Sequence, residues 1–408
     1  MLITTVLLAT AALAQEPAAE EPATVLQEAP EVVDAKLDAW RVLLLDQAYQ
    51  AGSLMPESPF IKDRSRAQER VVVAALQLGL PVRALRYIEG IDNWRRGSGY
   101  ADHARYCAEH GFQAEVEPSL EAALEIARQP TGEADQQWRR DRILSKVAAT
   151  RYVLGQEEAA AELSDKLEVA QQVAARAAQA EALSSEEFDA EIKRLRELAE
   201  VAGFDRKQVG IAACVRMYDR FFDDADRRGK LLVTIEDLWQ KIPADVQLST
   251  LMDLADICLQ HGKVELAARH TSKAWTIYDS YPWSAEFGVP WAGKLAGIHA
   301  RAGQPEETRG RVEAALSLYE EGTKTILGID RADALRPVAE AAQALGDREL
   351  AIRLYSKVLE VGADNPNARP RADDLVLTCI SMAIHEFEPT EGQASRIAEL
   401  VAGLEAPW

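Results

Sequence analysis

The sequence lacks the short motifs that mark the commonest catalytic sites. It contains no GxSxG, no HExxH, no phosphate-binding GxxxxGK[ST] loop and no GxGxxG after a strand. Its six histidines and many carboxylates show no spacing that singles out an acid–base pair. The sequence therefore predicts a protein that is not an enzyme and that needs no cofactor.

Basic residues are scarce relative to acidic ones. There are 46 Lys and Arg residues against 66 Asp and Glu, which gives a net charge of −20 at pH 7. A chain of this charge is repelled by nucleic acid and by anionic membrane surfaces. We therefore expect no nucleic acid among the partners, and a protein or peptide partner remains compatible.

Cysteine is also scarce, and no two cysteines form a CxxC pair. The four are Cys107, Cys214, Cys258 and Cys379. Two of them lie four residues before a glycine, on the apolar side of an expected helix. We interpret all four as buried thiols, with a disulfide in an exported protein as the alternative.

Long apolar runs are absent beyond the first 15 residues, so no stable membrane insertion is expected. The N-terminal run is itself too short to span a bilayer, and it ends in the small-x-small pattern of a signal-peptidase site. We predict a signal peptide over 1–14 that is cleaved after Ala14, and a periplasmic or secreted protein. An uncleaved anchor and a cytosolic start are alternatives, because no Lys or Arg precedes the run. Residues 15–34 are rich in Pro, Ala and Glu, which predicts a flexible acidic linker.

What the chain does contain is a recurring glycine between apolar, Ala-rich segments. The seven glycines are Gly79, Gly111, Gly155, Gly203, Gly262, Gly303 and Gly346. For each glycine we consider the residue seven positions before it and the residue five positions after it. Nine of these fourteen test positions are Ala. Where two helices cross closely, only a small side chain fits between the backbones. The glycine can adopt the left-handed conformation that ends the first helix of a pair.

This pattern predicts an all-α fold over residues 35–408. We expect a right-handed α-solenoid of about seven to eight stacked antiparallel helical hairpins, with C-terminal helices that cap the stack. The first helix of each hairpin is expected to line the concave face.

The segment from Leu345 through Gly346 to Ala351 and Tyr355 resembles the tetratricopeptide repeat family. The resemblance lies in the small residue on the first helix, the turn glycine, the Ala five residues later and the apolar or aromatic residue nine residues later. It spans roughly residues 65–360. The glycine steps are 32, 44, 48, 59, 41 and 43 residues, whereas the family period is 34. The resemblance implies a surface that binds a peptide or protein segment.

Two Trp-Arg-Arg triplets repeat 44 residues apart, each 17 residues before a turn glycine. Trp94 and Trp138 open them, and Arg95, Arg96, Arg139 and Arg140 follow. The arginines could form a carboxylate-binding ladder. Alternatively, each Trp packs under a turn and the arginines pair with nearby acids.

Six of the 26 aromatic residues fall within residues 275–291. They are Trp275, Tyr278, Tyr281, Trp283, Phe287 and Trp291. Aromatic side chains on a loop can stack on a sugar ring or hold apolar side chains of a peptide. They can equally seal a long link against the core.

His103, Cys107 and His110 share one helical face and could in principle ligate a metal. Core packing explains the same spacing, and we predict no metal site. The leading hypothesis is an exported, non-enzymatic scaffold that binds a protein or peptide in the solenoid groove. The alternative is a carbohydrate-binding, cell-wall-binding or enzymatic α-solenoid that uses the aromatic segment 275–291.

Overall fold

The computed structural model describes residues 31–408, except 130–136 and 169–170. This part of the chain contains nineteen α-helices and no strand, which confirms the all-α class. The expected signal peptide, 1–14, and most of the expected linker, 15–34, lie outside the described residues.

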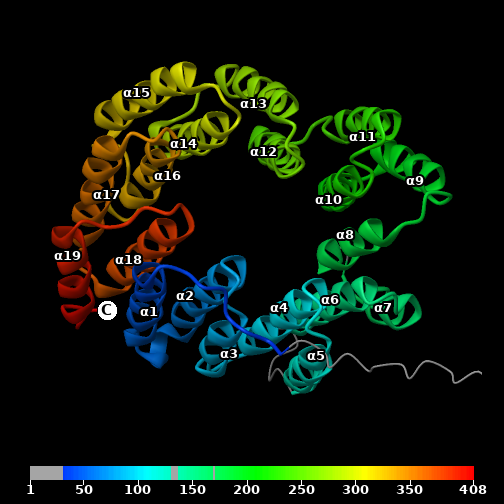
Figure 1. The fold of residues 1–408 in the computed structure, drawn as a ribbon, viewed down its shortest axis with the longest axis horizontal. Helices are drawn as coiled ribbons and strands as arrows, with labels where there is room; N and C mark the ends of the chain where they lie inside the picture. Colours follow the sequence, from blue (N-terminus) through cyan, green and yellow to red (C-terminus); the bar gives the residue numbers. More distant parts are fainter. Residues whose placement is uncertain (1–30, 130–136, 169–170) are drawn as a thin grey trace, which may run out of the picture.

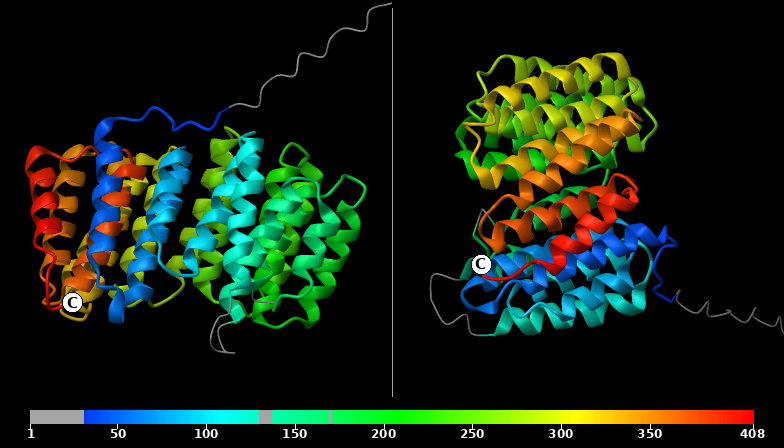
Figure 2. Two further views of the ribbon diagram at one scale, coloured as in Figure 1. Left: turned by 90° about the horizontal axis from the view of Figure 1, so that it is seen from below. Right: turned by 90° about the vertical axis from the view of Figure 1, so that its left-hand side faces the viewer.

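The helices form two concentric layers (Figure 1). The inner layer consists of α2 (Glu57–Gln77), α4 (Arg95–Glu109), α6 (Gln137–Val153), α8 (Val173–Ala182), α10 (Phe204–Arg220), α12 (Ala244–Gln260), α14 (Ala285–Arg301), α16 (Arg331–Ala344) and α18 (Ala368–Ile384). The outer layer consists of α1 (Ala39–Leu54), α3 (Pro81–Glu89), α5 (Gln113–Arg128), α7 (Glu157–Ser164), α9 (Phe188–Val201), α11 (Ala225–Leu238), α13 (Val264–Asp279), α15 (Pro305–Gly322), α17 (Arg348–Ala363) and α19 (Glu391–Ala402). Figure 2 shows the helices standing side by side, broadly along the axis of the assembly.

The solenoid closes into a ring. Each inner helix from α2 to α16 contacts the next inner one, and α18 in turn contacts α2. Helix α1 packs on both α18 and α2, and α19 lies against α1, α17 and α18. The stack therefore differs from the expected one with a free, capped end, because its last helices meet its first.

Side chains from both ends of the chain stabilise this closure. Arg41 on α1 donates from Nε to the carbonyl of Ala383, at 2.9 Å, and pairs with Glu386 at 3.1 Å. Arg70 on α2 pairs with Asp373 on α18 at 2.9 Å. These contacts join residues that are more than 300 positions apart in sequence.

Six of the seven expected glycine turns are confirmed. Their φ angles lie between +68° and +80°, and each ends an inner helix: Gly79, Gly111, Gly155, Gly262, Gly303 and Gly346. The prediction for Gly203 is wrong, since its φ is −74° and it precedes α10 as the N-cap residue. The chain there passes from the outer helix α9 to the inner helix α10, so no left-handed turn is needed.

The alanine pattern marks the core. All nine Ala residues at the test positions are 0 % exposed, and they lie where helices cross: Ala84, Ala104, Ala148, Ala160, Ala255, Ala267, Ala296, Ala339 and Ala351. Among the glycines that the structure describes, the closest approach to the backbone of another helix is at Gly293 on α14. A Cβ there would lie 2.6 Å from the backbone of Pro337 and Val338 on α16. These small residues let neighbouring backbones pack directly against each other.

The chain just before the first helix is bound to the ring. The Asp34 carboxylate accepts hydrogen bonds from the backbone N–H groups of Val82, at 2.8 Å, and Arg83, at 3.2 Å, and so caps the start of α3. The N–H of Ala35 donates to Gly79 at 2.7 Å. Asp34, which the sequence placed in the linker, is thus attached to the first hairpin.

All four cysteines are free and buried, in agreement with the expectation of buried thiols. Burial raises the pKa of Cys107 and Cys379 to about 12, so both stay protonated at neutral pH. In the described part of the chain, no helix combines the length and apolarity needed to cross a bilayer.

Candidate functional site

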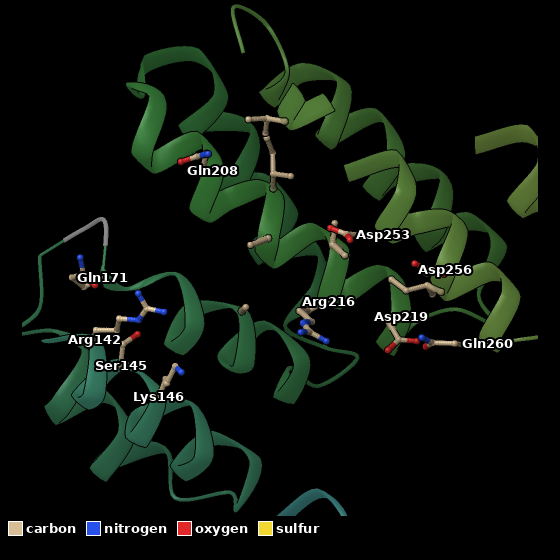
Figure 3. Close-up of a pocket in the computed structure, with 16 residues that line it drawn as sticks. Arg142, Ser145, Lys146, Gln171, Gln208, Arg216, Asp219, Asp253, Asp256 and Gln260 are labelled. Carbon is tan, nitrogen blue, oxygen red and sulfur yellow. The ribbon is translucent and has the colours of Figure 1, made fainter. Parts of the chain in front are cut away.

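A cavity of about 840 Å³ opens on the inner wall of the ring, between α6, α8, α10 and α12 (Figure 3). We use the term floor for the apolar residues of α10 and α12 that line the cavity: Ile211, Ala212, Val215, Val246 and Ile257. Polar and charged side chains form most of the remaining lining: Arg142, Ser145, Lys146, Gln171, Gln208, Arg216, Asp219, Asp253, Asp256 and Gln260. First helices of hairpins thus line the concave face at this position, as expected.

The charges around the cavity are sorted by sign. Arg142 and Lys146 lie on the α6 side, whereas Asp253 and Asp256 lie on the α12 side (Figure 3). Arg216 on α10 stands between the two groups. The cavity therefore has a cationic wall and an anionic wall within a chain whose overall charge is strongly negative.

Some of these charged side chains already contact partners in the protein. Lys146 donates to Asp102 at 2.6 Å and to Ser98 at 2.8 Å. The other paired lining residues are Asp219 with His261, at 2.8 Å, and Asp256 with Arg301, at 2.5 Å. These contacts orient the three side chains along the wall, and those of Lys146 and Asp256 are ion pairs.

Three lining charges have no oppositely charged partner within 4 Å among the described residues. They are Arg142, Arg216 and Asp253. Arg142 instead lies over the ring of Trp94, 5.9 Å from its centroid. Arg216 is close enough to lower the pKa of Asp253 without forming an ion pair with it.

Asp253 titrates in an unusual range. Desolvation by the surrounding helices raises its pKa to about 6, and the neighbouring Asp256 raises it further, while Arg216 acts in the opposite direction. The desolvation contribution is the largest of the three. A cationic group placed beside Asp253 would favour its ionised form.

A polar network extends the cationic wall toward the ring closure. Glu69 on α2 pairs with Arg95 on α4 and accepts a hydrogen bond from Ser98 at 2.8 Å. Ser98 in turn accepts from Lys146, which also binds Asp102. Burial raises the pKa of Asp102 and lowers that of Arg95, and the ionic partner opposes the shift in each case.

A second hollow of about 460 Å³ lies beside this network, between α2, α4, α6 and α18. Arg142 and Lys146 line both hollows, so the two share the α6 wall. The second hollow also has apolar side chains from α18 and α2: Leu377, Ile380, Ile384 and Val73. A continuous surface thus runs along the inside of the ring from α18 to α12.

The structure brings the two Trp-Arg-Arg triplets together. Their tryptophans lie at the starts of adjacent inner helices, and the rings of Trp94 and Trp138 meet edge to face at 5.2 Å. Arg95 lies over Trp94 and pairs with Glu69, and it lines the second hollow. Arg139 lies over Trp138. Arg96 is half-buried and Arg140 is exposed, and neither lines the cavities described above.

The aromatic residues of 275–291 surround the link between α13 and α14: only Tyr281 and Trp283 lie in the link, whereas the other four lie on the two helices. Trp275 is buried on α13, and the rings of Tyr278 and Trp283 stack at 5.7 Å. The Tyr278 hydroxyl donates to the carbonyl of Gly288, and the Trp283 indole donates to the carbonyl of Tyr278. These bonds fold the link onto itself.

The remaining aromatic residues of this segment are more accessible. Tyr281 is 47 % exposed and Phe287 is 58 % exposed, whereas Trp291 is half-buried on α14 with Lys294 over its ring. They do not line the large cavity.

His103 and Cys107 belong to the core. His103 is buried, and its Nδ1 shares a hydrogen bond with Ser119 at 2.9 Å. His110 is exposed and stacks on Tyr106. Burial lowers the pKa of His103, which keeps its imidazole neutral near pH 7. No group of three metal-ligating side chains occurs in the part of the chain that the structure describes.

Sequence reasoning missed the charged residues of the cavity. Arg142 follows Trp138 by one helical turn, and this spacing was a usable signal. Arg216 and Asp253 gave no local signal, because a charged residue on an exposed helical face has the same pattern whether it meets water or a ligand.

No family model matches this sequence, and the curated proteins contain no match to it. Among solved structures, the chain is similar to one described as a circular tandem repeat protein with novel repeat topology and enhanced subunit contact surfaces. That alignment covers 90 % of this chain and 95 % of the other, at 14 % identity and a TM-score of 0.18. The ring described above rests on the contacts of this chain alone.

Proposed function

We propose that this chain is an exported, non-enzymatic repeat scaffold that holds an extended segment of a partner protein inside its ring. The cavity between α6 and α12 carries the proposal. Its volume falls in the range of sites that bind ligands. Ten of its sixteen lining residues are polar or charged, which suits a partner segment that itself carries polar and charged side chains. The hairpin pattern around Gly346 supports a place among tetratricopeptide-like repeats, whose concave faces serve this purpose.

The shape of the ring favours a segment over a folded domain. The cavity continues along the inner wall into the second hollow, which gives a path rather than a single pocket. A chain without regular structure can follow such a path and expose its side chains to successive helices.

Export rests on the sequence of residues 1–14. The apolar run and the small-x-small ending support cleavage after Ala14 and a periplasmic or secreted location. Mass spectrometry of the protein purified from its native cell tests this directly. A mature chain that begins at Gln15 supports export, whereas an intact N-terminus in the cytosolic fraction contradicts it.

Affinity capture tests the binding function. The mature chain, residues 15–408, is used as bait in crosslinked native envelope extract and compared with Val215→Trp, which fills the cavity floor. Val233→Trp is the matched control, because Val233 is 50 % exposed on the outer helix α11. We expect the same protein to be enriched by the unchanged chain and by the control, and to be lost with Val215→Trp. Capture that is indifferent to Val215→Trp would contradict the proposal.

A further inference from the structure

We propose that the segment bound in the cavity carries both an acidic and a basic side chain, separated by apolar residues, with the acidic one held at Arg142 and Arg216 and the basic one at Asp253. This inference rests on the proposed function and adds the chemistry of the ligand. It follows from which lining charges the protein itself leaves without a partner.

Two guanidinium groups of the cavity are available to an anion, one on the α6 wall and one on α10 between the two walls. Arg142 on α6 and Arg216 on α10 line the same cavity, and neither forms an ion pair within the described residues. Lys146, the third cation there, is held by Asp102 and Ser98 and is therefore satisfied. Guanidinium groups suit a carboxylate because they can donate two parallel hydrogen bonds to it.

The anionic side offers a single free carboxylate. Asp253 lines the cavity without a cationic partner within 4 Å in the described residues, whereas Asp219 and Asp256 are paired with His261 and Arg301. A Lys or Arg side chain of the ligand would form an ion pair with Asp253. The desolvation that disfavours its ionised form would be offset by such a partner.

The apolar floor of the cavity favours apolar residues in the middle of the bound segment. Ile211 and Val215 on α10 and Ile257 on α12 belong to the apolar part of the cavity lining. Apolar side chains of the ligand would bury their area here, and this burial is the main source of affinity in most sites. The charged groups at either side then fix the direction in which the segment lies.

Synthetic peptides test this chemistry. The probes are 10-residue peptides, acetylated and amidated so that the termini carry no charge, with Leu and Val residues between one Glu and one Lys at varied spacing. Matched peptides carry Gln in place of Glu, or Met in place of Lys. Affinities for the full mature chain are measured by fluorescence anisotropy. We expect each neutral replacement to weaken the best peptide by about tenfold or more.

Protein variants assign each loss to its partner. Replacing Glu by Gln in the peptide should cost little once Arg142→Gln and Arg216→Gln are both present, and replacing Lys by Met should cost little with Asp253→Asn. Arg353→Gln on α17 and Asp223→Asn after α10 are controls, since both residues are exposed and lie outside the cavity.

The outcomes separate the inference from the function on which it rests. If peptides bind but neutral ones bind as tightly, or if the losses are unchanged in the cavity variants, the inferred chemistry is wrong while segment binding stands. If no peptide binds and Val215→Trp also leaves affinity capture unchanged, both proposals are wrong. Losses that vanish only in the matching cavity variant establish the inference.

Discussion

The guanidinium of Arg41, on the first helix, donates a hydrogen bond of 2.9 Å to the carbonyl of Ala383, near the end of α18. The two residues are 342 positions apart, and their contact lies at the junction that closes the solenoid into a ring. A repeat stack with free ends leaves its terminal helices least protected. Here the terminal helices pack on each other, and the inner wall forms an unbroken circuit.

Ring closure predicts that α1 is as protected as the interior helices. In hydrogen exchange, amides of Ala39–Leu54 should exchange as slowly as those of α18, although α1 is the first helix. Arg41→Ala should speed exchange in both helices together and should cost about 1 kcal/mol of stability. Fast, fraying exchange confined to α1 would contradict closure.

The crossing of α14 and α16 depends on Gly293. Gly293→Ala would place a methyl group 2.6 Å from the backbone of Pro337 and Val338, which forces the helices apart. We expect a loss of about 1 to 3 kcal/mol in the free energy of unfolding, measured by urea denaturation. Gly310→Ala on α15 is the matched control, since nothing lies within 4 Å of its added methyl group. That change should stabilise the protein by about 0.5 to 1 kcal/mol.

Asp374 makes stability depend on pH. It is buried beside Arg336, and desolvation raises its pKa to about 8, so the folded protein holds a proton there that the unfolded chain releases near pH 4. The contribution of protonated Asp374 to the free energy of unfolding is therefore fully present below about pH 4 and is lost as pH rises toward 8. Asp374→Asn should unfold less readily than the unchanged protein at pH 9, by about 1 to 3 kcal/mol.

The control for this prediction is Asp364→Asn, an exposed change at the end of α17. Thermal unfolding of the three proteins between pH 5 and pH 9 gives the comparison. The difference between Asp374→Asn and the unchanged protein should shrink as pH falls. A constant difference across the range would show that Asp374 does not titrate between pH 5 and pH 9 in the folded protein, and would contradict the raised pKa.

Ligand affinity should also depend on pH, through Asp253. Its pKa of about 6 means that its charge is lost as pH falls through this value, with Asp256 beside it on α12 and Arg216 facing it from α10. A bound cation favours the ionised form of Asp253 and lowers this pKa. The affinity for a peptide carrying Lys should therefore fall between pH 7.5 and pH 5, as Asp253 takes up a proton. Anisotropy titrations measure the change. The dependence should disappear in Asp253→Asn, and a dependence that survives there would assign it to another group.

The local architecture could be predicted from sequence because short-range geometry dictates it. A left-handed turn favours glycine, and a close helix crossing requires a small side chain, so Gly346 and Ala351 carry their structural roles in their identities. The prediction for Gly203 failed because a glycine can also precede a helix. The residues at its two test positions, Arg196 and Gln208, depart from the alanine pattern.

Ring closure could not be predicted in this way. It depends on the small rotation from each hairpin to the next, summed over the whole chain, and no single residue encodes that sum. The contact between Arg41 and Ala383 has no local signature for the same reason.

The cavity was predictable only in part. The repeated triplets indicated that Trp94 and Trp138 were equivalent, and they lie side by side because their helices start at the same level of adjacent hairpins. The raised pKa of Asp253 and its place in the cavity depend on Arg216 and on other neighbouring helices, so its own sequence context does not reveal them.

The most direct test of the account is photocrosslinking from inside the ring. A benzoylphenylalanine is placed at Ala212, on the cavity floor, or at Val233, on the outer helix α11, and the protein is irradiated in its native cells. We predict that Ala212 crosslinks to one segment of one partner, which carries an acidic and a basic residue on either side of apolar ones, and that Val233 does not. Crosslinks to that partner from Val233 and none from Ala212 would contradict binding inside the ring.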